Sequence, residues 1–212
     1  MNQHDHARQP QGVTLASASP RRQELLRQIG VPFQVVNHQV PETLLDHESA
    51  EQFVTRLARE KARDVVRRQP ADASPVVLGA DTVVVCDDRI LGKPVDGEHA
   101  IQMLSLLSAR EHHVLSAVAV VSRDHCREAL SATKVEFRRL DPAELEAYWQ
   151  SGEPRDKAGA YAIQGRAAVF VRNLQGSYSG VMGLPLYETA ELLAAFDVPC
   201  WQLPEADPGG LP

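Results

Sequence analysis

Short apolar runs alternate with amphipathic stretches along most of this chain. The apolar runs are rich in β-branched residues and predict strands at residues 13–16, 33–36, 76–85, 113–121, 126–137 and 168–174. Apolar residues at helical spacing predict helices after Pro20, at about 53–68, around 100–107, after Asp141 and around 186–194. Since strands and helices alternate, we expect an α/β fold in which helices flank a mixed, largely extended central sheet.

Glycine, proline and aspartate mark where several of these elements begin and end. Gly30 fits the position that follows the last residues of the first helix. Asp141 followed by Pro142 fits a helix N-cap and the first helical residue. Asp87 and Asp88 predict a turn that leads into a short return strand.

Length and composition are those of one globular unit. The chain has 212 residues, of which 43% are hydrophobic and 24% charged, and this length suits a single core. We predict a domain at residues 13–198, an N-terminal tail at 1–12 and a C-terminal tail at 199–212. The net charge of −6 argues against a protein that coats nucleic acid, so any anion site must be a local cluster of arginine and lysine.

No segment has the features of a signal peptide or of a membrane span. The first dozen residues lack a basic region followed by an apolar one, and no apolar run approaches the roughly 20 residues that cross a bilayer. We therefore expect no membrane association and a cytoplasmic location. The three cysteines lack a C-x-x-C pair, and we interpret them as passive thiols.

Several reactive side chains have simple interpretations. His4 and His6 could bind a metal, but a solvated tail is favoured. His112 and His113 lead into an apolar strand, where a packed or edge histidine is favoured over a metal ligand. The stretch GSYSG at 176–180 has tyrosine where a nucleophile elbow needs serine. The absence of a Walker lysine motif and of a G-x-G-x-x-G fingerprint disfavours a P-loop kinase and a Rossmann dehydrogenase.

The segment LASASPRRQELL at 15–26 combines hydroxyl and guanidinium groups at the start of a helix. Ser19 before a proline fits an N-cap, and the free N–H groups of a helix N-terminus favour negative charge. Ser17, Arg21 and Arg22 add further donors to phosphate oxygens. From these residues alone, a phosphate site and a structural cap with two solvent-facing arginines both stay open.

Asp81 interrupts the apolar run at 76–85. We expect it at or near the end of a central strand, where open α/β sheets place ligands in a crevice. Its carboxylate could hold a divalent metal, take a proton from water, or organise a loop. Glu42 and Lys61 lie in charge-rich stretches typical of a solvated surface. Lys93 lies between a glycine and a proline, which would fix the direction of a lone cation.

Six blocks of sequence, taken in order, give the chain a specific likeness. They are LASASPRRQELL, RLAREKA, LGADTVV, GKP, DKAGAYAIQG and GSYSGVMGLPL, and the first contains the signature S-x-x-R-x-x-L. With these blocks the chain resembles the Maf family of nucleoside triphosphate pyrophosphatases over about residues 13–198. The resemblance implies a Maf-like and ITPase-like fold with a nucleotide cleft at strand ends.

The resemblance also implies a chemistry, the hydrolysis of a nucleoside triphosphate to the monophosphate and pyrophosphate. Asp81 would accept the proton of the attacking water, and Glu42, Lys61 and Lys93 would line the same catalytic cleft. Asp81 and Glu42 would hold a divalent cation, Mg²⁺ or Mn²⁺. Relatives suggest a homodimer.

Substrate contacts follow from the same resemblance. The residues expected to contact the triphosphate are Ser17, Ser19, Arg21 and Arg22. Arg21, Thr82 and Gln164 would influence which base is accepted. The sequences S-P-R-R, A-D-T and A-I-Q-G match the branch that hydrolyses dTTP and UTP, with modified pyrimidine nucleotides also within reach. The alternatives are a pyrophosphatase for another base such as 7-methyl-GTP, and a nucleotide-binding regulator of cell division.

Overall fold

A mixed sheet of seven strands organises the computed structural model, which describes residues 12–70, 73 and 75–202. The strands are β1 (Val13–Leu15), β2 (Phe33–Val35), β3 (Val77–Cys86), β4 (Arg89–Leu91), β5 (Glu111–Val121), β6 (Cys126–Phe137) and β7 (Val171–Gln175). Their order is β2-β1-β3-β5-β6-β7, and β4 pairs with β3. The pairs of β1 with β2 and with β3 are parallel, whereas the pairs that link β3, β5, β6 and β7 are antiparallel. The expected mixed α/β sheet is therefore confirmed.

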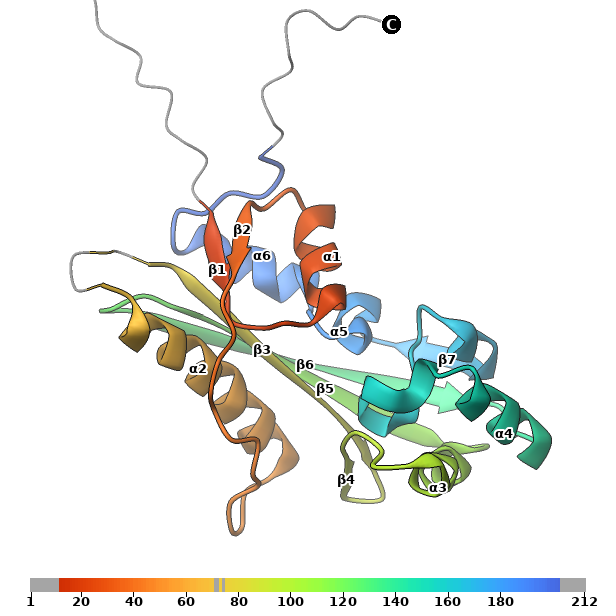
Figure 1. The fold of residues 1–212 in the computed structure, drawn as a ribbon. Helices are drawn as coiled ribbons and strands as arrows, with labels where there is room; N and C mark the ends of the chain where they lie inside the picture. Colours follow the sequence, from red (N-terminus) through yellow and green to blue (C-terminus); the bar gives the residue numbers. More distant parts are fainter. Residues whose placement is uncertain (1–11, 71–72, 74, 203–212) are drawn as a thin grey trace, which may run out of the picture.

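Helices cover both faces of this sheet (Figure 1). They are α1 (Pro20–Gln28), α2 (Ala50–Arg68), α3 (Gly97–Leu107), α4 (Pro142–Gln150), α5 (Tyr178–Met182) and α6 (Leu186–Ala194). Three 3-10 turns follow α4, namely η1 (Glu153–Asp156), η2 (Ala158–Ala160) and η3 (Arg166–Phe170). The long helix α2 lies along one face, α1 and α6 lie on the other, and α3 and α4 gather at the far end of the long strands (Figure 1).

Alternate residues of β3 enter different parts of the core. Val77 and Val83 pack with α2 in one apolar cluster, whereas Leu78 and Ala80 pack with α1 and α6 in another. A third cluster joins α3, α4 and the 3-10 turns to the distal ends of β3, β5 and β6. Because β3 is buried on both faces, its sequence is a continuous apolar run rather than an alternating one.

Gly79 brings α2 against β3 without an intervening side chain. A Cβ at Gly79 would overlap the carbonyl oxygen of Ala58 and crowd the backbone nitrogen of Ala62. Both of these residues lie in α2, on either side of Lys61. The glycine therefore fixes how closely the helix that carries this lysine approaches the strand that carries Asp81.

The predicted start and stop signals are largely confirmed. Gly30 has a φ of 65° and follows α1, where its N–H donates to Arg27 O and that of Val31 donates to Leu26 O. Asp141 caps α4 with a capping box, and Pro142 is the first helical residue.

One strand boundary was wrong, and one helix was not anticipated. The strand predicted at 168–174 is divided, because residues 166–170 form η3 and β7 begins only at Val171. The short helix α5 lies in the stretch GSYSGVMG, where Gly183 ends it with a φ of 119°. Both differences fall where tertiary contacts, rather than apolar periodicity, set the backbone.

The two predicted tails fall mostly on residues outside the described part of the chain. Of the N-terminal tail at 1–12, which includes His4 and His6, only Gly12 is described, and of the C-terminal tail only 199–202. Trp201 N donates to Ile29 O at 2.7 Å and Gln202 N to Gly30 O at 2.9 Å. These two residues are therefore attached to the turn after α1.

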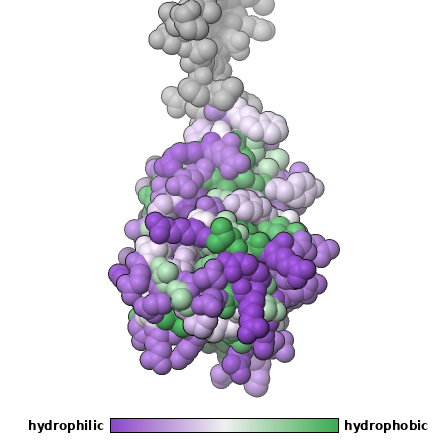
Figure 2. Space-filling view, turned by 90° about the vertical axis from the view of Figure 1, so that its right-hand side faces the viewer, coloured by the Kyte–Doolittle hydropathy of each residue, from purple (hydrophilic) through white to green (hydrophobic). Residues whose placement is uncertain are grey.

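The remaining interpretations concern packed and surface side chains. His112 is 1% exposed and meets the rings of Phe137 and Tyr161 edge-on, so the packed-histidine interpretation is confirmed. The three cysteines are free thiols. No helix in the described residues is long and apolar enough to cross a membrane. From the side of α4 and β7, the surface is mainly hydrophilic, with hydrophobic side chains in small patches (Figure 2).

Candidate active site

A large cavity lies where the edge of β3 is left open by its neighbours. β1 pairs with β3 only as far as Leu78, and β4 joins the same strand at Val84. The cavity has a volume of about 1020 Å³ and includes residues of β3 between these two points. All ten predicted site residues line it: Ser17, Ser19, Arg21, Arg22, Glu42, Lys61, Asp81, Thr82, Lys93 and Gln164.

The predicted position of Asp81 within its strand was wrong. Asp81 is the fifth of the ten residues of β3 and pairs with Ala117 of β5, so it does not lie at a strand end. The parallel strand β1, in contrast, stops at Leu15, and Ser17 lies two residues after its end. The cavity therefore opens at the carboxyl end of β1, and Asp81 reaches it because β3 is much longer than its parallel neighbour.

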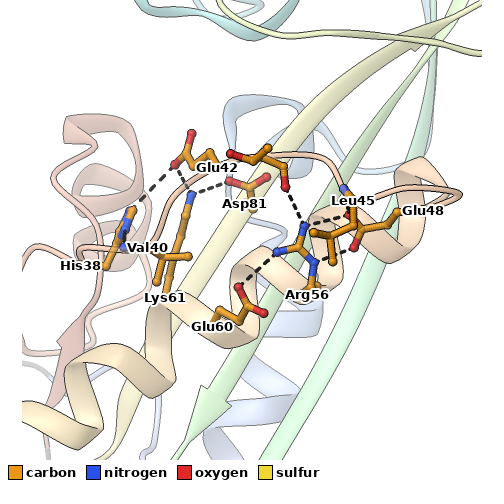
Figure 3. A network of polar contacts seen from close by, with 10 residues as sticks. His38, Val40, Glu42, Leu45, Glu48, Arg56, Glu60, Lys61 and Asp81 are labelled. Carbon is orange, nitrogen blue, oxygen red and sulfur yellow. Dashed lines mark hydrogen bonds and ion pairs between the residues drawn. The ribbon is translucent and has the colours of Figure 1, made fainter.

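Lys61 connects the two acidic residues of the site (Figure 3). Its Nζ donates to Glu42 Oε1 at 2.5 Å and to Asp81 Oδ1 at 2.6 Å. Only 2% of Lys61 is exposed, although it lies in a helix whose outer face is charged. A buried ammonium needs such partners, because an unpaired charge in the interior is strongly destabilising.

The two carboxylates respond differently to their surroundings. Burial raises the pKa of Asp81, and the charges of Lys61 and Arg22 only partly offset this effect. Burial also acts to raise the pKa of Glu42, but its hydrogen bond with Lys61 and the charges of Lys61 and Lys93 lower the pKa overall. The pKa of Asp81 is therefore raised while that of Glu42 is lowered, and a raised pKa suits a carboxylate that takes a proton.

His38 was not anticipated as part of the site. Its Nε2 lies 4.0 Å from Glu42 Oε1, and its Nδ1 accepts a hydrogen bond from Val40 N (Figure 3). Burial, followed by the charge of Lys61, lowers the pKa of His38. A neutral ring that accepts at Nδ1 carries its proton on Nε2, facing the glutamate. A lone histidine in a polar loop has no sequence signal for this position.

The serine and arginine turn faces the cavity. Ser17 Oγ accepts hydrogen bonds from Arg22 Nη1 at 3.0 Å and from Ser19 N at 3.2 Å. Ser19 is the N-cap of α1, but its side chain makes no capping hydrogen bond. The predicted position of the cap is therefore confirmed, and without a side-chain capping hydrogen bond the N–H groups of the first turn are available to an anion.

Carbonyl oxygens at the C-terminal end of α5 hold both arginines. Arg21 Nε donates to Met182 O at 3.3 Å, and Arg22 Nε donates to Gly183 O at 2.9 Å. The interpretation of these arginines as solvent-facing does not hold, because burial lowers the pKa of both groups. Their guanidinium groups stay cationic and concentrate positive charge at the turn.

Two lysines add to the positive charge of the cavity. Lys93 is exposed on the cavity wall, and Lys157 lies half-buried on the wall between η1 and η2. Burial, followed by the charge of Arg21, lowers the pKa of Lys157. Lys157 was not among the predicted residues. Its place in the block DKAGAYAIQG, beside a glycine-rich turn, was the available signal.

Glu153 holds the loop that carries Gln164. Its carboxylate accepts hydrogen bonds from Tyr148 Oη at 2.8 Å, Arg166 N at 3.0 Å and Ala167 N at 3.4 Å. A Cβ at Gly165 would overlap this carboxylate, so a larger residue there would displace Glu153 from these hydrogen bonds. Gln164 is consequently held at the rim, with its side chain exposed to the cavity.

The donor set at Asp81 and Glu42 fits a divalent cation that also binds the substrate. Both carboxylates reach one nitrogen atom, Lys61 Nζ, so their oxygens lie close together. Among the described residues, no three acidic, histidine or cysteine side chains cluster as a complete metal site. Mg²⁺ is commonly held by one or two carboxylates together with substrate phosphates, so two protein ligands suffice.

Several known proteins are similar to this chain in sequence. Three relatives carry the name dTTP/UTP pyrophosphatase. The protein from Alkalilimnicola ehrlichii is 53% identical over 88% of this chain and 93% of its own length. The proteins from Xanthomonas oryzae pv. oryzae and Methylococcus capsulatus are 54% and 55% identical, over 86% and 85% of this chain and 97% and 89% of their own lengths.

Two further comparisons concern the fold and the family. A crystal structure of a Vibrio cholerae protein superposes with a TM-score of 0.47 and 13% identity, over 89% of this chain and 96% of that one. The family model described as Maf-like protein matches residues 12–196, which is most of the chain. With this match and relatives above 50% identity over most of its length, the chain belongs to the Maf-like protein family.

Proposed function

We propose that this protein is a nucleoside triphosphate pyrophosphatase that hydrolyses dTTP and UTP, and modified pyrimidine nucleotides, to the monophosphate and pyrophosphate. One observation carries the proposal: a buried ammonium–carboxylate pair, Lys61 and Asp81, shares a cavity with the cationic turn at Ser17–Arg22. The names of the similar proteins support the same substrates. A carboxylate and a cluster of cations are what hydrolysis of a phosphoanhydride requires.

Asp81 is the proposed general base. Water attacks the α-phosphorus, its proton passes to the Asp81 carboxylate, and the bond between the α-phosphorus and the bridging oxygen breaks. Pyrophosphate leaves with the electrons of that bond, and the monophosphate keeps the oxygen that came from water. Lys61 keeps the Asp81 carboxylate in one orientation through its 2.6 Å contact.

The cations stabilise charge on the departing pyrophosphate. Arg21, Arg22 and Lys93 are the proposed contacts to the phosphates, together with the hydroxyl groups of Ser17 and Ser19. Arg22 is held from two sides, by Ser17 Oγ and Gly183 O, so it is oriented before substrate binds. Preorganised charge of this kind is more effective than mobile charge at a developing anion.

Asp81 and Glu42 are the proposed ligands of Mg²⁺ or Mn²⁺. When bound, such a cation would supply Lewis-acid neutralisation of the phosphate oxygens. Glu42 has the lowered pKa and so remains a carboxylate where a cation needs it. The base is proposed to be selected by Arg21, Thr82 and Gln164, which line the same cavity.

A panel of triphosphates tests this function. Release of pyrophosphate from dTTP, UTP, CTP and 7-methyl-GTP is measured with Mg²⁺ and with Mn²⁺, for the wild type and for Asp81→Asn. We expect release from dTTP and UTP above all, and strong loss of this activity in the variant. Preference for 7-methyl-GTP would overturn the pyrimidine assignment. Tight nucleotide binding without any release would favour a nucleotide-binding regulator of cell division.

The assembly and location of the protein are also proposals. The resemblance to the family favours a homodimer in the cytoplasm that binds a nucleoside triphosphate and no nucleic acid. Light scattering on the purified protein, with and without nucleotide, tests the dimer. A monomer under both conditions would contradict it.

A further inference from the structure

A buried chain of hydrogen bonds runs from the cavity wall to α5. Thr82 Oγ1 and Ser116 Oγ lie 2.8 Å apart, and Ser116 Oγ lies 2.6 Å from the carbonyl oxygen of Gly180. Only 1% of Ser116 is exposed. Thr82 and Ser116 face each other across the β3–β5 ladder, and Thr82 lines the cavity.

The end of this chain determines its direction. A carbonyl oxygen only accepts hydrogen bonds, so the single hydroxyl hydrogen of Ser116 points at Gly180 O. Ser116 therefore accepts from its other neighbour, and the hydroxyl hydrogen of Thr82 points at Ser116. With its hydrogen committed to the core, Thr82 has only oxygen lone pairs to offer to the cavity.

Thr82 lies on the part of the wall closest to the arginine turn. A Cβ at Gly183 would stand 3.8 Å from both Thr82 Oγ1 and Arg22 Nε, so these two groups border the same point. On this side an arginine provides donors, and Thr82 provides an acceptor. Gln164, whose amide can donate and accept, lies on the same cavity.

We infer that Ser116 is a positioning residue that fixes Thr82 as a hydrogen-bond acceptor and thereby selects a pyrimidine base that carries an N–H at N3. The inference rests on the proposed function. Uracil and thymine carry N–H at N3, whereas cytosine has a lone pair there. Two facing lone pairs repel, so the cavity should reject cytosine without any steric contact.

Ser116 has a second effect that the test must separate from the first. Through Gly180 it anchors α5, and the carbonyl oxygens at Met182 and Gly183 hold Arg21 and Arg22. Loss of the anchor would weaken the binding of every triphosphate alike. If the hydroxyl hydrogen of Thr82 were no longer fixed in direction, only the ratio of the affinities for the two bases would change. The ratio of the affinities for two bases on the same triphosphate therefore reports the proposed role of Ser116.

Calorimetric titration with the non-hydrolysable α,β-imido analogues of UTP and CTP tests the inference. The wild type should bind the uridine analogue at least about tenfold more tightly, the scale of one well-placed hydrogen bond. In Ser116→Ala the Thr82 hydroxyl is free to turn and donate, so the ratio should fall to about threefold or less. Thr82→Val should also lose the ratio. The double variant should have the same ratio as Thr82→Val alone, because both residues act on this ratio through one contact.

Ser131→Ala is the matched control. Ser131 is a buried serine that pairs with Ser116 across the β5–β6 ladder and does not line the cavity. Its variant should keep the wild-type ratio. Should Ser116→Ala fail to fold, Ser116→Cys replaces it with a weak donor and acceptor of similar size, and the same fall is expected.

Two outcomes overturn the inference: a wild type that binds both analogues equally, or a folded Ser116 variant whose affinities fall together at a constant ratio. Pyrophosphate release from UTP is measured separately on the wild type. Binding with the expected ratio but without release would contradict the proposed hydrolysis alone, and release without discrimination would contradict the inference alone.

Discussion

Lys61 Nζ lies 2.6 Å from Asp81 Oδ1, inside a helix–strand contact from which solvent is almost excluded. Each charge makes the burial of the other tolerable, and removal of one partner leaves an uncompensated charge. The same contact keeps the carboxylate pointed into the cavity. Structure and proposed chemistry therefore depend on one pair, and substitutions in it should affect both.

The first prediction concerns Asp81. Replacement by asparagine removes the proton acceptor, so turnover of UTP should fall by about 10²- to 10⁴-fold, the usual scale for a general base. Pyrophosphate release under saturating UTP measures it. Asp87→Asn, on the exposed turn at the end of the same strand, should keep full activity. An Asp81→Asn protein that is folded and turns over at the wild-type rate would rule out the assignment.

Arg22 should not be replaceable by lysine. The guanidinium donates through Nε to Gly183 O and through Nη1 to Ser17 Oγ, and one ammonium cannot reproduce this fork. We expect KM for UTP to rise by about 10- to 100-fold in Arg22→Lys, since oriented phosphate contacts are lost. Initial-rate kinetics measures it, with Arg27→Lys on the exposed side of α1 as the control. Equal KM values in the wild type and Arg22→Lys would contradict the role.

Glu153 should act on substrate binding through the loop of Gln164. All three of its contacts come from donors, so Glu153→Gln turns an amide NH₂ toward a donor and loosens residues 164–167. KM for UTP should rise more than kcat falls, because the reacting groups lie elsewhere in the cavity. Steady-state kinetics separates the two constants. Glu146→Gln on the outer face of α4 should change neither, and a pure loss of kcat would refute this role.

His112 should make the protein less stable in mild acid. Burial lowers its pKa from 6.5 to about 4, so between these values the unfolded chain binds a proton that the folded chain does not. This contribution to stability is present above pH 6.5 and is lost as the pH falls toward 4. From pH 7 to pH 5 the free energy of unfolding should drop by about 2 kcal/mol.

Urea denaturation at the two pH values measures this drop. His112→Phe removes the titrating group and should show a smaller drop, although its stability at pH 7 also falls because Tyr161 Oη loses a hydrogen-bond partner. His125→Gln, on the exposed turn between β5 and β6, should keep the wild-type difference. An undiminished drop in His112→Phe would place the effect elsewhere.

Apolar periodicity was sufficient for most of the fold. The stripe from Phe53 to Val66 predicted α2, and the run at 76–85 predicted β3 to within one residue. Both elements are long and buried on a defined face, so their sequence repeats report their surroundings directly. Start and stop signals at Gly30 and Asp141 are local, which is why they were also readable.

Periodicity failed where distant side chains set the backbone. Residues 168–170 were predicted to begin a strand because they are apolar, but they belong to a 3-10 turn whose first residues, Arg166 and Ala167, are held by the carboxylate of Glu153. Asp81 was expected at a strand end because polar residues usually end apolar runs. It lies in mid-strand because a lysine from α2 neutralises it there, and the sequence does not reveal that pairing.

The candidate site was accessible from sequence only in part. A resemblance to a family named ten residues, and one cavity contains them all. His38 and Ser116 were missed, since a histidine and a serine outside a motif look like any others. Lys157 was missed although it lies in the block DKAGAYAIQG. Ser116 acts through the direction of a hydrogen bond, which depends on a carbonyl 64 residues later in the chain.

The contact at Gly79 has a consequence for how related proteins can diverge. Backbone lies against backbone there, so no change of side-chain rotamer can alter the distance between α2 and β3. The backbone contact therefore fixes the distance between the Lys61 ammonium and the Asp81 carboxylate. The residues proposed to select the base, Arg21, Thr82 and Gln164, contact the cavity through side chains, which substitution can change. Because the reacting pair and the base-selecting side chains are held separately, the base preference can change without altering the proposed hydrolytic step.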